Sequence, residues 1–230
     1  MTSAALRKAE IASALGSRLA SAFQLRERAE SDLAPTGIAE LDAAIGGLPR
    51  GAITEIYGVA SSGRTSLLLA GLAAAAARQE VCALVDASDA FDPASAAAAG
   101  ARLDRLLWVR CGGNLSRAIQ AADLLLQGGG FGLVAIDLGD ASPSLARRIP
   151  LASWFRFRRA VEDTPTVLIV IEQQPHAGSC ASLILEMTRT GVAWSGYGDC
   201  SRLLRGFTLR AERRKPSRAA GAIFQTHAVE

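Results

Sequence analysis

Residues 58–66, GVASSGRTS, follow the pattern of a phosphate-binding loop apart from one residue. In that pattern glycines let backbone N–H groups close around phosphates, a lysine reaches the β- and γ-phosphates, and a hydroxyl holds Mg²⁺. Gly58, Gly63 and Thr65 fit, whereas Arg64 stands where the lysine belongs. The spacing leaves three interpretations open: a working nucleotide site, a site that binds without hydrolysis, or a structural relic.

A carboxylate that could support Mg²⁺ beside Thr65 is Asp137, at the end of the apolar stretch LVAIDLGD. Asp137 could instead cap the turn that follows this stretch. The candidate nucleotide-binding residues of the loop are Gly58, Ser61, Ser62, Gly63, Arg64, Thr65 and Ser66. Only Lys8 and Lys215 are lysines among the 25 basic residues, so a general preference for arginine is a second explanation of Arg64.

The elements around the loop occur in the order that such a site requires. A strand over 52–58 leads into the loop, and an alanine-rich helix over 65–79 follows it. Further apolar strands are predicted over 81–87, 106–111, 132–140 and 166–174, with helices over 93–101, 115–127 and 144–162. Strands without polar alternation are buried on both faces, which predicts an α/β fold with a mostly parallel central sheet between helices. Residues 206–227 predict two strands around a turn, forming an antiparallel C-terminal edge.

Composition favours one globular domain with an added terminal element. The chain has 230 residues, half of them hydrophobic, and residues 1–34 are expected to form an amphipathic helix and a linker before a core over 35–230. No apolar run approaches the roughly 18–20 residues of a membrane helix, and the N-terminus lacks a signal-peptide pattern. We therefore expect a cytoplasmic protein without a membrane partner. The four cysteines have no C-x-x-C spacing, which predicts buried, reduced thiols rather than a metal site.

Several motifs together resemble the core of bacterial RecA recombinase. These are TGIAELDAAIGGLPRGAITEIYGVASSGRTS, ALVDASDAFDP, LVAIDLGD and LIVIEQQ, which occur in register over about residues 35–215. The resemblance implies a RecA-like P-loop fold with ATP and Mg²⁺ as cofactors, Mg²⁺ being held by Thr65 and Asp137. It also implies that Asp92 lies near the adenine and that Gln173 senses the γ-phosphate.

The same resemblance shows what this chain lacks. Ser88 falls where RecA has its catalytic glutamate, and a hydroxyl is no base near neutral pH, so the chain has no catalytic residue in that role. Asp89 is the alternative base if the strand end shifts by one residue. Ser95 replaces the tyrosine that stacks on adenine in RecA. Arg213 and Lys215 fall near two lysines that RecA places at the filament interface, which implies self-association.

The segment after the sensing glutamine, PHAGSCASLILEMTRTG, is the counterpart of a long DNA-contacting segment in RecA. Here it is short, and Arg189 is its only strongly basic side chain. A short, degenerate RecA-like chain is similar to the ImuA family of accessory proteins in SOS mutagenesis. This similarity implies an ImuB-like protein and an error-prone replicative-type polymerase as partners in translesion synthesis, and RecA as a further partner.

Other surfaces could carry a partner or DNA. Residues 202–218 hold seven basic residues against Glu212, a net of about +6 in a chain whose total is +3; a solvated strand edge is the alternative. In residues 144–162, helical spacing places basic side chains on one side of a helix and Leu151, Trp154 and Phe155 on another, as a contact surface would require. The alternative is that these apolar side chains belong to the core. The N-terminal helix offers Leu19, Phe23 and Leu25, while His176 and His227 are expected at the surface. The basic candidates are Arg148, Arg156, Arg159, Arg213, Arg214 and Lys215.

Three functions follow in order of preference. The first is a non-recombinase accessory protein of the DNA damage response that supports translesion synthesis through protein contacts, with little or no ATP hydrolysis. The second is an active DNA-dependent ATPase of the RecA or RadA kind, favoured by Gly63, Thr65, Asp137 and Gln173 and opposed by Ser88. The third is an autonomous DNA-binding protein that depends on the basic residues of 202–218.

Overall fold

The computed structural model describes residues 32–196, 201–216 and 220–227. Its compact core unit runs from Ala34 to Glu230. The helix predicted over 4–30, with Leu19, Phe23 and Leu25, lies outside the described residues, as do Cys200 and Arg218. Within the described part, no helix is long and apolar enough to cross a membrane.

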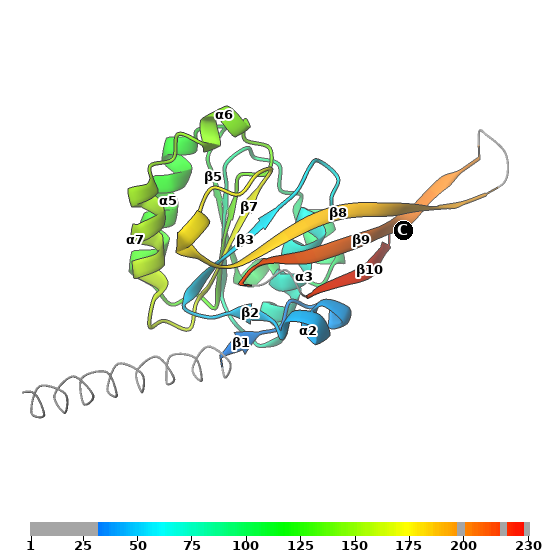
Figure 1. The fold of residues 1–230 in the computed structure, drawn as a ribbon, viewed down its shortest axis with the longest axis horizontal. Coiled ribbons are helices and arrows are strands. Elements are labelled where there is room, and N and C mark those ends of the chain that lie inside the picture. Colours follow the sequence, from blue (N-terminus) through cyan, green and yellow to red (C-terminus); the bar gives the residue numbers. More distant parts are fainter. Residues whose placement is uncertain (1–31, 197–200, 217–219, 228–230) are drawn as a thin grey trace, which may run out of the picture. The chain divides into compact units, whose positions relative to one another are not determined.

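An eight-stranded sheet forms the centre of the core unit, in the order β10-β9-β8-β3-β7-β6-β4-β5 (Figure 1). β3 (Ala52–Tyr57) pairs in parallel with β7 (Val167–Glu172) and with β8 (Ala181–Ser195). β6 (Leu133–Asp137), β4 (Cys82–Asp86) and β5 (Leu106–Arg110) continue the parallel part. β9 (Leu203–Lys215) and β10 (Gly221–His227) form the predicted antiparallel edge. The predicted α/β fold is confirmed.

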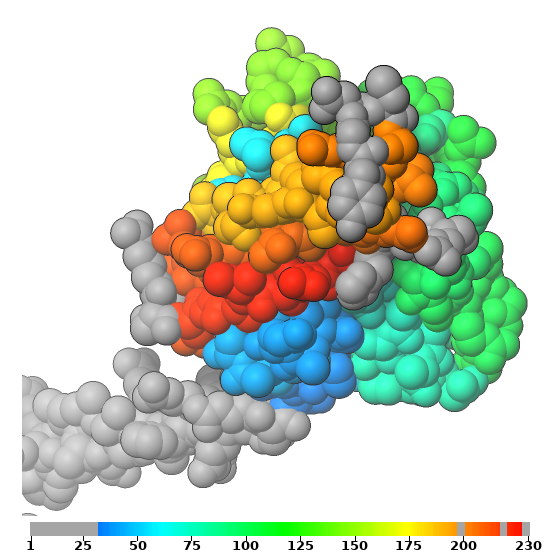
Figure 2. Space-filling model, turned by 90° about the vertical axis from the view of Figure 1, so that its right-hand side faces the viewer, coloured from blue at the N-terminus to red at the C-terminus, as the bar shows by residue number. Residues whose placement is uncertain are grey.

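Short elements lead into the sheet. β1 (Leu33–Ala34) and β2 (Leu48–Pro49) form a separate two-stranded sheet, and α2 (Ala39–Ile45) lies between them in the chain. α2 ends at Gly46, whose φ of 85° requires the left-handed region that glycine adopts without a steric cost. α2 lies beside β10 at the antiparallel edge of the sheet, seen in Figure 2 as the blue and red surfaces.

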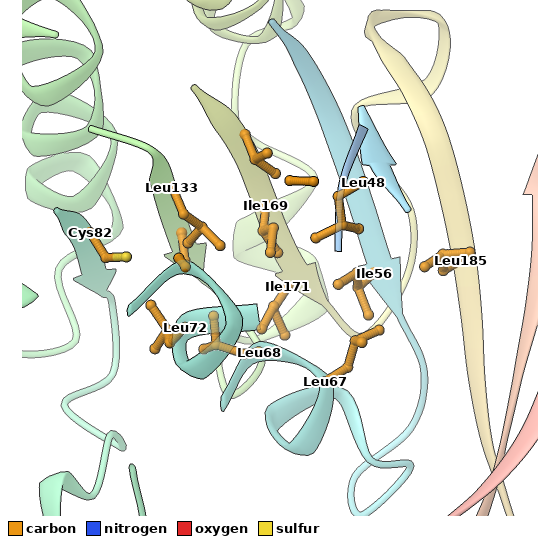
Figure 3. Packing of buried hydrophobic residues seen from close by; sticks show 14 of the residues in the cluster. Leu48, Ile56, Leu67, Leu68, Leu72, Cys82, Leu133, Ile169, Ile171 and Leu185 are labelled. Carbon is orange, nitrogen blue, oxygen red and sulfur yellow. The ribbon is translucent and has the colours of Figure 1, made fainter. Parts of the chain in front are cut away.

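One face of the sheet is covered by α3 (Arg64–Ala77), which follows the glycine loop directly. Leu67, Leu68 and Leu72 of α3 pack on apolar side chains of the parallel strands, including Ile56 and Ile171 (Figure 3). Both helix and strands are apolar here, so their contact removes a large hydrophobic area from water. This packing fixes the start of α3 relative to the carboxyl ends of the strands.

The other face is covered by α5 (Leu115–Gly128) and α7 (Leu151–Val161) (Figure 1). Ala118 and Ala122 of α5 and Trp154 and Phe157 of α7 are buried in the core cluster on this face. The remaining elements lie in the connections: α4 (Pro93–Ala98), the 3₁₀ turn η1 (Leu103–Arg105), α6 (Pro143–Ala146) and the 3₁₀ turn η2 (Gly178–Cys180). Cys82, Cys111 and Cys180 are buried free thiols, as predicted.

Two sequence predictions were wrong in detail. The helix predicted over 144–162 is split into α6 and α7, because Pro150 lies where a continuous helix would need its N–H. As a result Arg148 lies between the two helices rather than on a helix face. The segment predicted as a short loop after Gln173 is a strand from Ala181 onward, so only residues 174–180 remain as a connection.

Candidate functional site

The candidate site lies where the carboxyl ends of four parallel strands meet. Tyr57, Asp86, Asp137 and Glu172 are the last residues of β3, β4, β6 and β7, and the register brings these ends to one edge. Ligands of parallel sheets bind at this edge, outside the carboxyl ends of the strands. The glycine loop leaves from the same edge and turns into α3.

The geometry of the loop is that of an anion-binding turn. Gly63 is the N-cap of α3 with a φ of 92°, and Ser61 also has a positive φ of 59°. Gly63 has no side chain with which to cap the helix, so the first-turn N–H groups have no side-chain partner. Such an N-terminus carries a partial positive charge and suits a phosphate group. Thr65 is exposed beside it, while Ser62 is buried.

Close packing also explains why glycine stands at positions 58 and 63. A Cβ atom on Gly58 would collide with the main-chain carbonyl oxygen of Met187 and with Ser62. A Cβ atom on Gly63 would collide with the side chain of Leu209. The loop therefore lies tightly against β8 and β9, and these glycines are required by the fold whether or not a phosphate binds.

Arg64 is drawn into the protein instead of extending freely over the loop. Its side chain is almost fully buried, and its Nη1 donates to the carbonyl oxygens of Glu172 at 2.7 Å and Gly139 at 3.4 Å. Both acceptors are neutral main-chain groups at the ends of β7 and β6. Burial lowers the pKa of the Arg64 guanidinium, while Asp137 and Asp140 raise it. The cation at the lysine position thus ties the end of β7 to the loop that follows β6.

Asp137 caps the turn that follows its strand, the alternative considered from the sequence. Its Oδ1 accepts a hydrogen bond of 2.8 Å from the N–H of Gly139. Burial is the main cause that raises the pKa of this carboxyl, and Asp86 and Asp140 raise it further. A bound divalent cation would offset this cost, because it favours the charged carboxylate. Its role as a Mg²⁺ ligand stays a prediction.

Ser88 and Asp89 lie where the resemblance to RecA places its catalytic glutamate. Ser88 lies in the connection after β4, and its neighbour Asp89 turns toward β5. Asp89 accepts from the N–H of Gly112 at 3.0 Å and pairs with Arg110 at 3.1 Å. The Gly112 hydrogen bond is the main cause that lowers the pKa of Asp89. A carboxylate held in this way is a poor proton acceptor, which argues against Asp89 as a substitute base.

Asp86, which the sequence reasoning did not single out, organises this connection. Its buried carboxylate accepts from the N–H groups of Ala90 at 3.1 Å and Phe91 at 3.0 Å, and from Nε1 of Trp108 at 3.2 Å. Asp92, predicted near the adenine, is the N-cap of α4 and accepts from the N–H of Ser95 at 2.9 Å. Both carboxylates therefore have structural roles that fix the shape of this connection.

Gln173 follows β7 and donates from Nε2 to the carbonyl oxygen of Gly139 at 3.0 Å and that of Ala141 at 3.4 Å. It therefore contacts the same loop as Arg64, namely residues 138–142 between β6 and α6, which we call the post-β6 loop. The structure brings together Arg64, Asp137 and Gln173 around residues 139–141, whereas Asp92 is engaged at α4. Their roles toward a nucleotide stay predictions.

A buried carboxylate cluster under the site was missed from the sequence. Glu55 is fully buried in β3, and its Oε1 accepts from the N–H groups of His176 at 2.5 Å and Ala177 at 2.7 Å. Oε2 of the buried Glu172 is hydrogen-bonded to Nδ1 of His176. Burial raises the pKa of Glu172 to about 7, and the hydrogen bond with Glu172 raises the pKa of His176. His176 is thus mostly buried rather than a surface residue, contrary to the prediction.

Only some of the side chains predicted to form a contact surface over residues 144–162 are exposed. Trp154 is a core residue, while Leu151 and Phe155 on α7 are about half exposed. Arg148 and Arg159 are exposed, and Arg156 pairs with Asp123 at 3.2 Å.

In the C-terminal group, all three predicted cations have partners within this chain. Arg214 contacts Glu186 and Glu212, and Nζ of Lys215 donates to carbonyl oxygens including that of Ser179 at 3.2 Å. Arg213 also has a partner. Several of these contacts join β9 to β8 and to the segment that precedes β8, so the group offers less free charge than its sequence indicates.

The residues fit ATP and Mg²⁺ in part. The uncapped start of α3 fits phosphate oxygens, and a threonine hydroxyl with a carboxylate suits Mg²⁺. The lysine position and the base position do not fit a hydrolytic site, because Arg64 is held by two carbonyl groups and Ser88 carries no carboxylate. Among the described residues, no group of three or more histidine, cysteine or acidic side chains is placed to hold a metal by itself.

Comparison with known proteins agrees with this geometry. The family model of the RecA N-terminal domain matches residues 3–148, more than half of the chain. The chain belongs to the RecA family. Protein RecA of Leifsonia xyli subsp. xyli is 37% identical over 163 residues, covering 64% of this chain and 45% of that protein. Protein RecA of Deinococcus radiodurans is 36% identical over 154 residues, covering 60% of this chain and 42% of that protein.

The predicted RecA-like core is thereby confirmed. The chain spans less than half the length of these RecA relatives. The glycine loop, Ser88 and Asp137 lie within the matched residues, while Gln173 and all of β7 to β10 lie beyond the family model. The part of the chain that carries the glycine loop, Ser88 and Asp137 is therefore the part matched by the family model.

Proposed function

We propose that this chain is a non-recombinase accessory protein of the RecA family that supports error-prone translesion synthesis through protein contacts, as in the ImuA family. In this role the RecA core provides a stable scaffold, and hydrolysis of ATP is slow or absent. The proposed partners are an ImuB-like protein, an error-prone replicative-type polymerase and RecA. Self-association and contact with DNA would accompany these interactions.

The observation that carries the proposal is the arrangement around Arg64. The guanidinium that replaces the phosphate-loop lysine binds two carbonyl groups of the protein, at the ends of β6 and β7. Ser88 leaves the site without the glutamate that RecA uses as a base. Arg64 is held by protein carbonyl groups and no glutamate stands at the position of the base. These features favour a role in binding partners over a role in ATP hydrolysis.

A nucleotide could still bind at the start of α3. The N–H groups of Arg64, Thr65 and Ser66 would hold phosphate oxygens, and Thr65 with Asp137 would hold Mg²⁺. ATP with Mg²⁺ would supply a triphosphate that ties the glycine loop to the post-β6 loop. Asp92 and Gln173 are proposed to border the nucleotide at its base and at its γ-phosphate, respectively.

An active ATPase is the second candidate, because Gly63, Thr65, Asp137 and Gln173 are all retained. It predicts that nucleotide-site variants abolish function. An autonomous DNA-binding role is weaker, because Arg214 and Lys215 are engaged within the chain.

Damage-induced mutagenesis in cells separates these candidates. A strain lacking the chain would be complemented with the wild type, Thr65→Ala or Asp137→Ala, and mutation frequency measured after DNA damage. The accessory role predicts that the wild type restores mutagenesis and that both variants restore it to within about twofold. Failure of the wild type would reject the translesion role, and failure of the two variants alone would favour the ATPase. Thermal unfolding of the purified variants would show that they are folded.

A further inference from the structure

The long hairpin of β8 and β9 projects beyond the rest of the sheet. β3 pairs with β8 only over residues 181–186, and β10 pairs with β9 only over residues 206–212. From Thr188 to Ser195, β8 pairs with β9 and with no other described strand. Figure 1 shows the two strands running out past the end of β10. We call residues 188–195 and 203–208 the hairpin arm.

One face of the hairpin arm carries an apolar stripe. The register places Val192 opposite Phe207 and Trp194 opposite Leu204, and directly opposed residues share a face of the sheet. Trp194 is 56% exposed, Val192 40% and Leu204 37%. The stripe consists of Val192, Trp194, Leu204 and Phe207. Isolated apolar residues on a surface are common, but here four lie in two adjacent cross-strand pairs on one face of a projecting hairpin.

The apolar stripe continues the core of the domain outward. The pair Met187 and Ala211 lies further along the same face and is buried in the main core cluster. Phe207 packs against that cluster, and Leu209, two residues from Phe207, is fully buried in it. The stripe is therefore anchored on rigid, packed residues, which lowers the entropic cost of binding a partner.

Two arginines lie within the hairpin arm. The guanidinium of Arg189 lies 5.5 Å from the centre of the Phe207 ring, and Nε of Arg205 donates to Oγ of Ser195 at 2.8 Å. Arg202 immediately precedes β9, and Asp199, outside the described residues, is the only acidic residue in the sequence from 188 to 208. Three arginines against one aspartate give residues 188–208 a net charge of about +2. A partner that complements this surface must therefore be both apolar and acidic.

The free edge of β8 adds a shape requirement. Beyond residue 186, the side of β8 away from β9 faces no described strand. Exposed strand edges accept extended segments through main-chain hydrogen bonds, while neighbouring side chains give specificity. An extended segment with alternating apolar and acidic side chains would meet the edge, the stripe and the arginines together.

Two other occupants fit less well. A second copy would bring two segments of about +2 together, and the four side chains of the stripe are far fewer than the roughly 20–30 residues a side of a stable interface. Single-stranded DNA binds through successive aromatic platforms. Trp194 is the one aromatic side chain of the stripe that is more than half exposed, and Val192 and Leu204 are aliphatic.

We propose that the hairpin arm is a docking surface for an extended, acidic and apolar protein segment. This inference rests on the proposed function, because an accessory protein must be recognised by a partner, and it names the chemistry of that partner. The segment lies along the free edge of β8 with its apolar side chains on the apolar stripe. Its carboxylates face the arginines of the hairpin arm.

The test uses the full-length chain and a fluorescent peptide of about ten residues that alternates valine or leucine with glutamate. Fluorescence anisotropy should show saturable binding, weakened at least tenfold in the double variant Trp194→Ala/Leu204→Ala. The matched control is Ile223→Ala, because Ile223 is 53% exposed on β10 and opposes Arg210 rather than the stripe. It should bind the peptide as the wild type does. A peptide with lysine in place of glutamate should bind at least tenfold more weakly.

Three outcomes would overturn the proposal: no binding of the glutamate peptide, equal binding by the double variant, or an equal loss in Ile223→Ala. Tighter binding of oligothymidylate of the same length, lost in the double variant, would also overturn it and assign the hairpin arm to nucleic acid. Because all the substituted side chains are exposed, the variants should keep their fold, which thermal unfolding would verify.

Measuring damage-induced mutation frequency in cells distinguishes a failure of the docking surface from a failure of the proposed function. If the wild type restores damage-induced mutagenesis and the double variant does not, both are supported. If the double variant restores it fully, the hairpin arm is not the docking surface and the accessory role stands. If the wild type itself fails while the peptide binds as expected, the translesion role is rejected and the docking surface is supported.

Discussion

At the scale of single residues, Arg64 occupies the lysine position of the phosphate-loop pattern and is buried within the fold. A lysine there would present a compact ammonium on a flexible stem, whereas arginine presents a planar fork. That fork reaches the carbonyl oxygens of Glu172 and Gly139, so the side chain stabilises the ends of β7 and β6. Any nucleotide must compete with these contacts for the guanidinium.

The variant Arg64→Lys is therefore expected to bind ATP with Mg²⁺ more tightly than the wild type, by about tenfold or more. The ammonium cannot make both carbonyl contacts in the same geometry and is free to reach the β- and γ-phosphates. Calorimetric titration would measure the affinity. Arg156→Lys, on the surface of α7, is the control and should leave the affinity unchanged. Equal or weaker ATP binding by Arg64→Lys would show that the arginine itself holds phosphate.

The buried cluster of Glu55, Glu172 and His176 predicts a dependence of stability on pH. The pKa of Glu172 is about 7 in the folded chain against an ordinary value of 4.5, and the pKa of His176 is also raised. The folded state therefore binds protons more tightly than the unfolded state, so stability falls as the pH rises. Glu55, whose pKa is raised by burial, acts in the same direction, while Arg147 lowers the pKa of His176.

The contribution of Glu172 is fully present below about pH 4.5 and is lost as the pH rises through about 7. Urea unfolding at about pH 5 and pH 8 should show a loss of roughly 2–3 kcal/mol from this group. In Glu172→Gln, which keeps the shape and cannot titrate, this part of the loss should disappear. Glu162→Gln on the surface should behave as the wild type does. An unchanged loss in Glu172→Gln would contradict the raised pKa of Glu172 as the cause of the pH dependence.

At the scale of elements, the connection between β4 and α4 depends on Asp86. The variant Asp86→Ala would leave the N–H of Phe91 and Nε1 of Trp108 without their acceptor in a buried region. We expect a loss of about 3 kcal/mol in the free energy of unfolding. Asp92→Ala, which removes an exposed helix cap, should cost about 1 kcal/mol. Urea denaturation of both variants would measure this, and a cost for Asp86→Ala no larger than for Asp92→Ala would contradict the assigned role.

The sequence was a good guide to the apolar strands and to the antiparallel edge, and a poor one to β8. β4 and β7 are unbroken apolar runs, which is why they could be placed. β8 was read as a loop because of its resemblance to a DNA-contacting segment. Its alternation was visible, since Leu183, Leu185 and Met187 are buried on one face. Period-two alternation would have identified it as a strand.

The candidate site was predicted in its residues but not in their contacts. The motif located Arg64, Asp137 and Gln173, and the structure brings them to the post-β6 loop. Spacing along the chain cannot show where a long guanidinium turns, because that depends on carbonyl groups from strands far away in sequence. For the same reason, the pairing of Glu55 with the backbone at His176 could not be read from residues 121 positions apart.

At the scale of the whole molecule, this chain combines a RecA-like core with an arginine at the lysine position of the glycine loop. The glycines of the loop are needed for packing on β8 and β9, whether or not a phosphate binds. If nucleotide still binds the folded chain, ATP with Mg²⁺ at about one hundred times its dissociation constant should stabilise the protein by about 2.7 kcal/mol. Thermal unfolding with and without ATP would detect this, and Thr65→Ala should lose the shift.

The central claim is that the RecA fold is used here without appreciable turnover of ATP. The most direct measurement is phosphate release by the purified wild type with Mg²⁺, with and without single-stranded DNA, beside Asp137→Ala as the matched inactive variant. We predict that release by the wild type does not exceed that of Asp137→Ala under either condition. Release that DNA stimulates and that Asp137→Ala abolishes would contradict the claim and identify the chain as an active ATPase.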